Sequence, residues 1–171
     1  MINAESRIEI TTKSSLILRD LDLLKQIKNL TVAMSINTLD ESFKNDMDKA
    51  SSIRNRLYTL KTLHENGIKT VLFMSPIFPG ITDFKAIIRV SKEFIDEYWF
   101  ENLNLRFPYK KTILVYIRDK YPEYFDLYQE IYVKENNSYW QTLASEIKKY
   151  CEENRISYRK YFHHDVLVKN K

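Results

Sequence analysis

Short apolar runs alternate along the chain with longer segments in which apolar residues recur every three or four positions. The short runs are bounded by polar or turn-forming residues, which is typical of buried strands. Four strands are predicted in this way, at Arg7–Thr12, Leu30–Ile36, Thr70–Ser75 and Tyr98–Leu103. A weaker pattern predicts a final strand at Ile156–Phe162.

The segments between the strands have the spacing of amphipathic helices. The apolar positions fall into three sets: Ile17, Leu21, Leu24 and Ile27; Ile53, Leu57, Leu60 and Leu63; and Phe84, Ile87, Ile88 and Phe94. Gly67 stands where the second helix should end, and Thr82 is predicted to cap the start of the third. The run Thr38-Leu39-Asp40-Glu41 has a capping-box pattern, which predicts a short extra helix.

Alternating strands and helices predict an α/β fold with a parallel sheet and right-handed crossovers. Periodicity does not decide between an open doubly wound sheet and a section of a barrel. From Arg106 onward the chain becomes rich in tyrosine and lysine, with helices expected at Lys110–Lys120, Glu123–Tyr132 and Tyr139–Cys151. We therefore divide the chain into a sheet-containing part, residues 1–107, and a C-terminal helical extension, residues 108–171, that packs on it.

Composition narrows the possible functions. Hydrophobic residues make up 44% of the sequence and charged residues 29%, as in globular proteins. The two glycines, Gly67 and Gly80, are too few for a glycine-rich phosphate loop. Cys151 is the single cysteine, so we expect no disulfide within the chain and an inert thiol. No apolar run is long enough to span a membrane and no signal peptide is visible, so we expect a cytoplasmic protein.

Ligands of parallel α/β proteins bind at the carboxyl ends of the strands. Lys13 follows the first predicted strand, the second ends in Ser35, Ile36 and Asn37, and the third ends in the proline-stiffened run Ser75–Gly80. The end of the fourth strand carries polar residues that we assign to a substrate: Glu101, Asn102, Asn104 and Arg106. Cation, hydroxyls and amides at one edge suit a nucleotide-like ligand, because a cation can hold a carboxylate or phosphate. The competing interpretation is ordinary loop caps and surface charges.

Three segments also carry a family resemblance: residues 9–20 (EITTKSSLILRD), 32–40 (VAMSINTLD) and 75–83 (SPIFPGITD). In this order and spacing they resemble successive blocks of the radical S-adenosylmethionine superfamily, and most closely its spore photoproduct lyase-like branch. Residues 100–106 (FENLNLR) and the tyrosine-rich extension resemble a subgroup called radical SAM mobile pair proteins. The resemblance implies the later strands of a partial (β/α)6 barrel.

The resemblance also implies roles for particular residues. Lys13 matches a lysine that holds the carboxylate of S-adenosylmethionine, and Ser35 and Asn37 match residues that meet its polar part. Ile77 matches a position that backs the adenine, although Pro76 stands where such proteins usually have glycine. The family also uses a [4Fe–4S] cluster held by a C-x3-C-x2-C motif, which is absent from this sequence. By this comparison Met1 begins just before the third barrel strand.

Two hypotheses follow. The chain is the C-terminal part of a radical S-adenosylmethionine lyase, inactive until it is joined to the missing half, or it is a non-catalytic module that binds a ligand, a nucleic acid or a protein. An unpaired strand at Arg7–Thr12 predicts self-association or pairing with that half. Basic and aromatic residues at Tyr109-Lys110-Lys111 and Lys148-Lys149-Tyr150 leave nucleic-acid binding open. We expect His163-His164-Asp165 to be a solvated tail and no metal site.

Overall fold

The structure is a computed structural model that describes residues 6–106 and 108–162, so His163-His164-Asp165 lies outside the described part. Five parallel strands form one sheet in the order β1-β2-β3-β4-β5. They are β1 (Ile8–Thr12), β2 (Leu30–Ser35), β3 (Lys69–Ile77), β4 (Glu97–Asn102) and β5 (Tyr158–Tyr161). All five predicted strands are present, and β3 is longer than expected at both ends.

Strands that are neighbours in the sheet are also consecutive in the chain. A doubly wound sheet would reverse its strand order at a switch point, whereas a (β/α) barrel adds each new strand on the same side. The observed order is therefore that of a section of a barrel. Because β5 joins the sheet, the C-terminal extension contributes a strand as well as helices.

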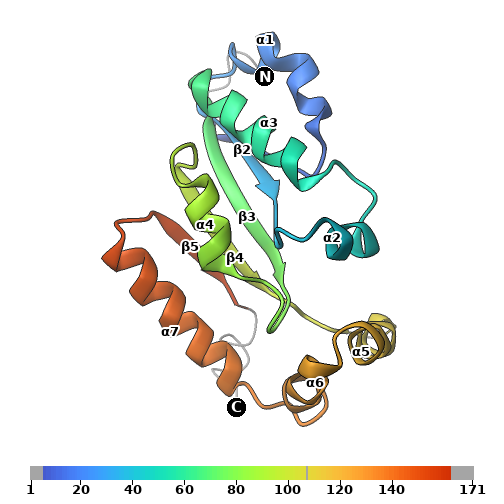
Figure 1. Ribbon diagram of the computed structural model, residues 1–171. Coiled ribbons are helices and arrows are strands. Elements are labelled where there is room, and N and C mark those ends of the chain that lie inside the picture. Colours follow the sequence, from blue (N-terminus) through green and yellow to red (C-terminus); the bar gives the residue numbers. More distant parts are fainter. Residues whose placement is uncertain (1–5, 107, 163–171) are drawn as a thin grey trace.

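Helices connect the strands and lie along the sheet or beyond its carboxyl edge (Figure 1). They are η1 (Ser15–Asp20), α1 (Leu21–Leu24), α2 (Glu41–Met47), α3 (Ile53–Glu65), α4 (Phe84–Ser91), α5 (Tyr109–Lys120), η2 (Pro122–Tyr124), α6 (Phe125–Tyr132) and α7 (Ser138–Glu153). In Figure 1, α3, α4 and α7 run beside the strands, and α2, α5 and α6 gather where the strands end.

Three local predictions are corrected. The single helix expected across Ile17–Ile27 is a 3-10 helix followed by one α-turn, since apolar spacing of three or four fits both helix types. Asp83 caps α4 by accepting from Ala86 N, and Thr82 instead accepts from Phe78 N and donates to the Asn37 carbonyl. Asp40 is the N-cap of α2 in place of Thr38.

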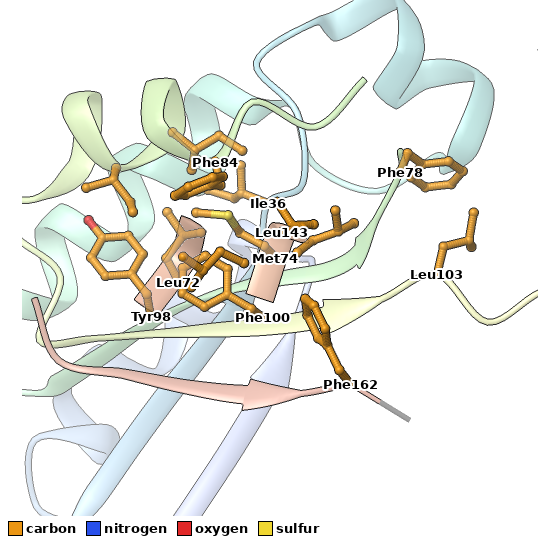
Figure 2. Close-up of a cluster of buried hydrophobic side chains, with 14 of the residues drawn as sticks. Ile36, Leu72, Met74, Phe78, Phe84, Tyr98, Phe100, Leu103, Leu143 and Phe162 are labelled. Atoms are coloured by element: carbon orange, nitrogen blue, oxygen red, sulfur yellow. The ribbon is translucent and has the colours of Figure 1, made fainter. Parts of the chain in front are cut away.

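Most of the hydrophobic core lies between the strands and α3, α4 and α7. Leu72 and Met74 of β3 and Phe100 of β4 are fully buried there, against Phe84 of α4 and Leu143 of α7 (Figure 2). A second cluster packs α1 and the end of α3 on β1 and β2. Alternate residues of each strand supply these contacts, as a half-covered sheet requires.

The extension is attached at the carboxyl edge by tyrosine hydroxyls. Tyr132 of α6 donates to the Leu103 carbonyl at 2.9 Å, and the Tyr139 hydroxyl of α7 accepts from Gly80 N at 3.2 Å. Gly80 has φ +76°, and a Cβ there would lie 2.6 Å from the Tyr124 ring. A glycine is therefore required at this position for both conformation and space.

The other face of the sheet has a different character. Its small cluster consists of the strand residues Ala33, Val71 and Trp99 with Phe73, and it includes no helix residue. Tyr161 adds a third ring, 5.8 Å from Trp99 and 6.1 Å from Phe73. In a complete barrel this face would line the interior, so we call it the barrel face.

The barrel face and the edge of β1 generate a prediction about association. β1 pairs with β2 alone among the described strands, and an unpaired edge favours pairing with another segment or chain. We propose that the purified chain self-associates at micromolar concentration, with an average mass above that of a monomer in light scattering. Thr11→Lys, which places a charge on the exposed face of β1, should shift the mass toward the monomer.

Thr142→Lys on the exposed side of α7 is the matched control and should leave the mass unchanged. A monomer mass for the unaltered chain throughout the concentration range would contradict the proposal.

Candidate functional site

Of the four predicted cofactor-binding residues, Lys13 is the one that is exposed to solvent. It follows β1 by one residue, and since Thr12 pairs with Met34, it reaches the level of Ser35 at the end of β2. Its ammonium lies 3.6 Å from Asp48 Oδ2, and 43% of its side chain is exposed. An accessible cation therefore stands at the carboxyl edge, where a parallel α/β protein binds ligands.

Ser35 and Asn37 join the end of β2 to the end of β3. The Ser35 hydroxyl donates to the Ser75 carbonyl at 2.9 Å, and the Asn37 amide donates to the Pro76 carbonyl at 2.8 Å. Ser35 is 5% exposed. Through these two hydrogen bonds, Ser35 and Asn37 hold the end of β2 against the end of β3.

The remaining predicted residues divide into buried and accessible ones. Ile77 packs in the core at 1% exposure, and Leu103 N donates to its carbonyl. Asn102 is equally buried, whereas Asn104 and Arg106 are exposed. Glu101 is half-buried and accepts a hydrogen bond from the Ser75 hydroxyl, a partner that the sequence did not indicate. Glu101 pairs with Tyr161 across β4 and β5, which places it at the rim of the barrel face.

Behind Lys13 lies a group of charges that sequence reasoning missed. Arg56 of α3 is 2% exposed and lies 2.5 Å from Asp48 Oδ1. It also donates to the carbonyls of Ser51, at 2.8 Å, and Ser35, at 2.9 Å. Lys44 of α2, 4% exposed, lies 3.5 Å from the same Asp48 oxygen and donates to the Ala50 carbonyl. Three cations thus surround one carboxylate.

The pKa of Asp48 lies below its ordinary value. Burial alone would raise it, but the hydrogen bond and charge of Arg56 outweigh burial, with smaller help from Ala50 N–H and Lys13. Asp48 is consequently ionised near neutral pH. The group still carries two more positive than negative charges, which favours an anion beside its one exposed member, Lys13.

One sequence signal could have pointed to Arg56. It stands three residues after Ile53 and four before Leu60, on the apolar face that the helical spacing defines. A charged residue on a buried helix face needs partners, because burying an unpaired charge is costly. Asp48 gives no such signal, since it lies in the irregular connection between α2 and α3.

The single cysteine and the acidic residues offer no metal site in the described part of the chain. Cys151 is fully buried in α7, and burial raises the pKa of its thiol to about 11, both of which favour the predicted inert thiol. No group of three potential metal ligands is found among residues 6–106 and 108–162. Within the same ranges, no helix has the length and apolar character needed to cross a membrane.

A groove lies on the extension between α5 and α6. It has a volume of about 580 Å³, and its apolar floor includes Leu114, Val115 and Phe125. Lys110, Lys111 and Arg118 line it as well, and Tyr109, at the start of α5, is 71% exposed but is not part of the lining. Lys148 and Lys149 of α7, the other basic pair noted in the sequence, instead lie 3.9 Å from Glu152 and Glu153.

Parallel strands in sequential order, with polar residues at their carboxyl edge, define a partial (β/α) barrel. The radical SAM superfamily profile matches residues 2–90, about half of the chain, and the chain therefore belongs to that superfamily. Crystal structures of SuiB from Streptococcus suis are similar in fold. The one bound to S-adenosylmethionine superposes with a TM-score of 0.59 at 19% identity, over 91% of this chain and 32% of SuiB.

Two curated relatives are similar in sequence. MJ0683 of Methanocaldococcus jannaschii, described as uncharacterized, is 39% identical over 127 residues, which are 74% of this chain and 48% of the relative. ORF301 of Acidianus two-tailed virus, also described as uncharacterized, is 38% identical over 72 residues, or 41% of this chain and 24% of the relative. The chain spans about half or less of the length of these relatives.

The buried charges predict a large effect of removing Arg56. Arg56→Met leaves Asp48 without its closest cation and the Ser35 and Ser51 carbonyls without a donor. We expect a loss of about 3 kcal/mol in the free energy of unfolding, measured by urea denaturation at neutral pH. Arg54→Met, the same change at an exposed position of α3, should alter it by less than about 0.5 kcal/mol.

At acidic pH, the difference in the free energy of unfolding between the Arg56→Met variant and the unaltered chain should be smaller. A carboxyl group with a lowered pKa contributes stability above its ordinary pKa, and this stability is lost as the pH falls through the folded-state value. The same denaturation at about pH 3 should therefore give a smaller difference than at about pH 7. Equal differences at both pH values would exclude a contribution from the Arg56–Asp48 ion pair.

Proposed function

We propose that this chain forms the later strands of a radical S-adenosylmethionine barrel in a spore photoproduct lyase-like protein. It supplies part of the S-adenosylmethionine wall and part of the substrate wall. Membership of the superfamily and the sequential parallel sheet support this proposal. The observation that carries it is the exposed Lys13 ammonium, set at the carboxyl edge in a group with excess positive charge.

The residues at this edge fit the polar end of S-adenosylmethionine. Lys13 would hold the carboxylate by a charge-assisted contact, which is stronger than a contact between neutral groups. Ser35 and Asn37, through their bonds to Ser75 and Pro76, would keep the neighbouring strand end in place. S-adenosylmethionine supplies the bond whose reductive cleavage begins radical chemistry.

The residues do not fit the iron–sulfur cluster. Three thiolates are needed, and the sequence has one cysteine, buried in α7. We propose that the cluster ligands belong to a preceding segment or to a second chain, which completes the barrel at the edge of β1. Glu101 of β4, held by Ser75, and Asn104 and Arg106 in the segment after β4 would then face the substrate. Asn102, the fourth residue assigned to the substrate, is buried.

Binding of S-adenosylmethionine by the chain as it stands tests the proposal. Isothermal titration should detect binding, and Lys13→Met should weaken it roughly tenfold to a hundredfold, because a contact between charged groups is lost. Binding of 5′-methylthioadenosine, which lacks the carboxylate, should not change. Lys28→Met, at an exposed position before β2, is the matched control.

Absence of binding by the unaltered chain would overturn the proposal that this chain supplies part of the S-adenosylmethionine wall. An equal loss for both compounds in Lys13→Met would reject the assignment of Lys13 to the carboxylate.

The groove between α5 and α6 favours a second candidate, a module that binds single-stranded nucleic acid. The Phe125 ring in its lining can stack on a base, and Lys110 and Lys111 can neutralise phosphates. Arg118 also lines the groove, although it is paired with Asp119 at 2.8 Å. Within the described ranges, neither Lys110 nor Lys111 forms an ion pair. This function requires neither S-adenosylmethionine nor a cluster.

Fluorescence anisotropy with a labelled single-stranded oligonucleotide tests this candidate. Lys110→Ala with Lys111→Ala should weaken binding roughly tenfold at low salt and reduce its salt dependence. Lys148→Ala with Lys149→Ala removes the same charge from α7, where glutamates already balance it, and should have a smaller effect. Equal effects of the two double variants would point to nonspecific attraction.

A further inference from the structure

The cations around Asp48 are not equivalent. Arg56 and Lys44 both approach Oδ1, both are buried, and each has backbone carbonyls as further acceptors. Lys13 approaches the other oxygen, Oδ2, at 3.6 Å, which is beyond an ordinary hydrogen bond. Since 43% of its side chain is exposed, Lys13 is the member of the group that can turn toward a ligand.

Asp48 itself is fixed in place. It is 20% exposed, receives Arg56 on Oδ1, and accepts the Ala50 N–H on the same oxygen at 3.0 Å. Arg56 in turn holds Ser51, whose hydroxyl accepts from Ser15 N at 2.8 Å, just beyond Lys13. Near neutral pH the Asp48 carboxylate is therefore a fixed negative charge beside Lys13, the residue proposed to meet a ligand carboxylate.

We propose that Asp48 is a positioning residue that occupies Lys13 in the free protein and competes with the ligand carboxylate for it. This inference rests on the proposed function, because it takes Lys13 as the group that meets the carboxylate of S-adenosylmethionine. Lys13 exchanges one carboxylate for another when the ligand binds. The remaining charge of Asp48 repels the ligand carboxylate and reduces the affinity that Lys13 alone would give.

If Asp48 competes for Lys13, removing its charge should strengthen the binding of S-adenosylmethionine, whereas removing a merely structural residue should weaken it. Asp48→Asn keeps an oxygen that can accept from Arg56 and Ala50, but removes the charge. Titration should show S-adenosylmethionine bound roughly three- to tenfold more tightly, because a nearby like charge is gone. The affinity for 5′-methylthioadenosine should stay unchanged. In a Lys13→Met background, Asp48→Asn should give a smaller gain, since the competition for Lys13 is absent.

Glu65→Gln removes an equivalent charge from the exposed end of α3 and serves as the control. If Asp48→Asn does not fold, as judged by circular dichroism, Asp48→Glu is measured in its place. The longer side chain brings the carboxylate closer to Lys13, so S-adenosylmethionine should bind more weakly and 5′-methylthioadenosine equally well.

Three results would overturn the inference. The first is unchanged binding of S-adenosylmethionine by Asp48→Asn while the unaltered chain binds normally, in which case the proposed function stands and the competition does not exist. The second is an equal loss of affinity for both compounds, which identifies a structural role. The third is no binding by the unaltered chain or by any variant, which rejects the proposed function and this inference together.

Discussion

Burial of the Arg56 guanidinium is the constraint on which the carboxyl edge depends. A charged group at 2% exposure must find partners, and its partners come from three places: the end of β2, residue 51 and Asp48. Satisfying this one side chain therefore fixes the segment between α2 and α3 against the end of β2. The Lys13 side chain takes its place against Asp48 as a result, so a residue inside α3 determines how a charge on the surface is presented.

The two faces of the sheet differ in how much of the hydrophobic core they carry. The helix-covered face carries the large cluster around Leu72 and Phe100. The barrel face carries a smaller cluster and aromatic rings in edge contact, with Trp99 at its centre. At its amino end, Glu97 accepts from Lys69 and Arg159, which ties β3, β4 and β5 together. Glu101 and Tyr161 stand at its carboxyl end, so polar groups flank the aromatic cluster at both ends of this face.

The sequence predicted the elements well wherever local patterning decides the outcome. The pattern of residues along the chain predicted all five strands and the positions of α3, α5 and α7. It also predicted that Lys13 lies at the carboxyl edge of the sheet, because Lys13 comes directly after β1. Spacing could not separate a 3-10 turn from an α-turn before β2, nor choose between Thr82 and Asp83 as a cap. It could not reveal the Arg56–Asp48 pair either, because that contact joins an apolar helix face to an irregular loop through tertiary packing.

The shape of the sheet bears on how such a chain works. A barrel has no free strand edges, whereas the described strands end at β5 on one side and on the other at β1, the strand that positions Lys13. A segment that pairs with β1 would also lie next to the proposed carboxylate site, so in the proposed arrangement completion of the sheet and formation of the ligand wall would be coupled by geometry. A segment bearing the cluster thiolates would then meet Lys13 as a direct neighbour. In that arrangement Asp48 would have a second consequence, because it balances part of the positive charge at this edge.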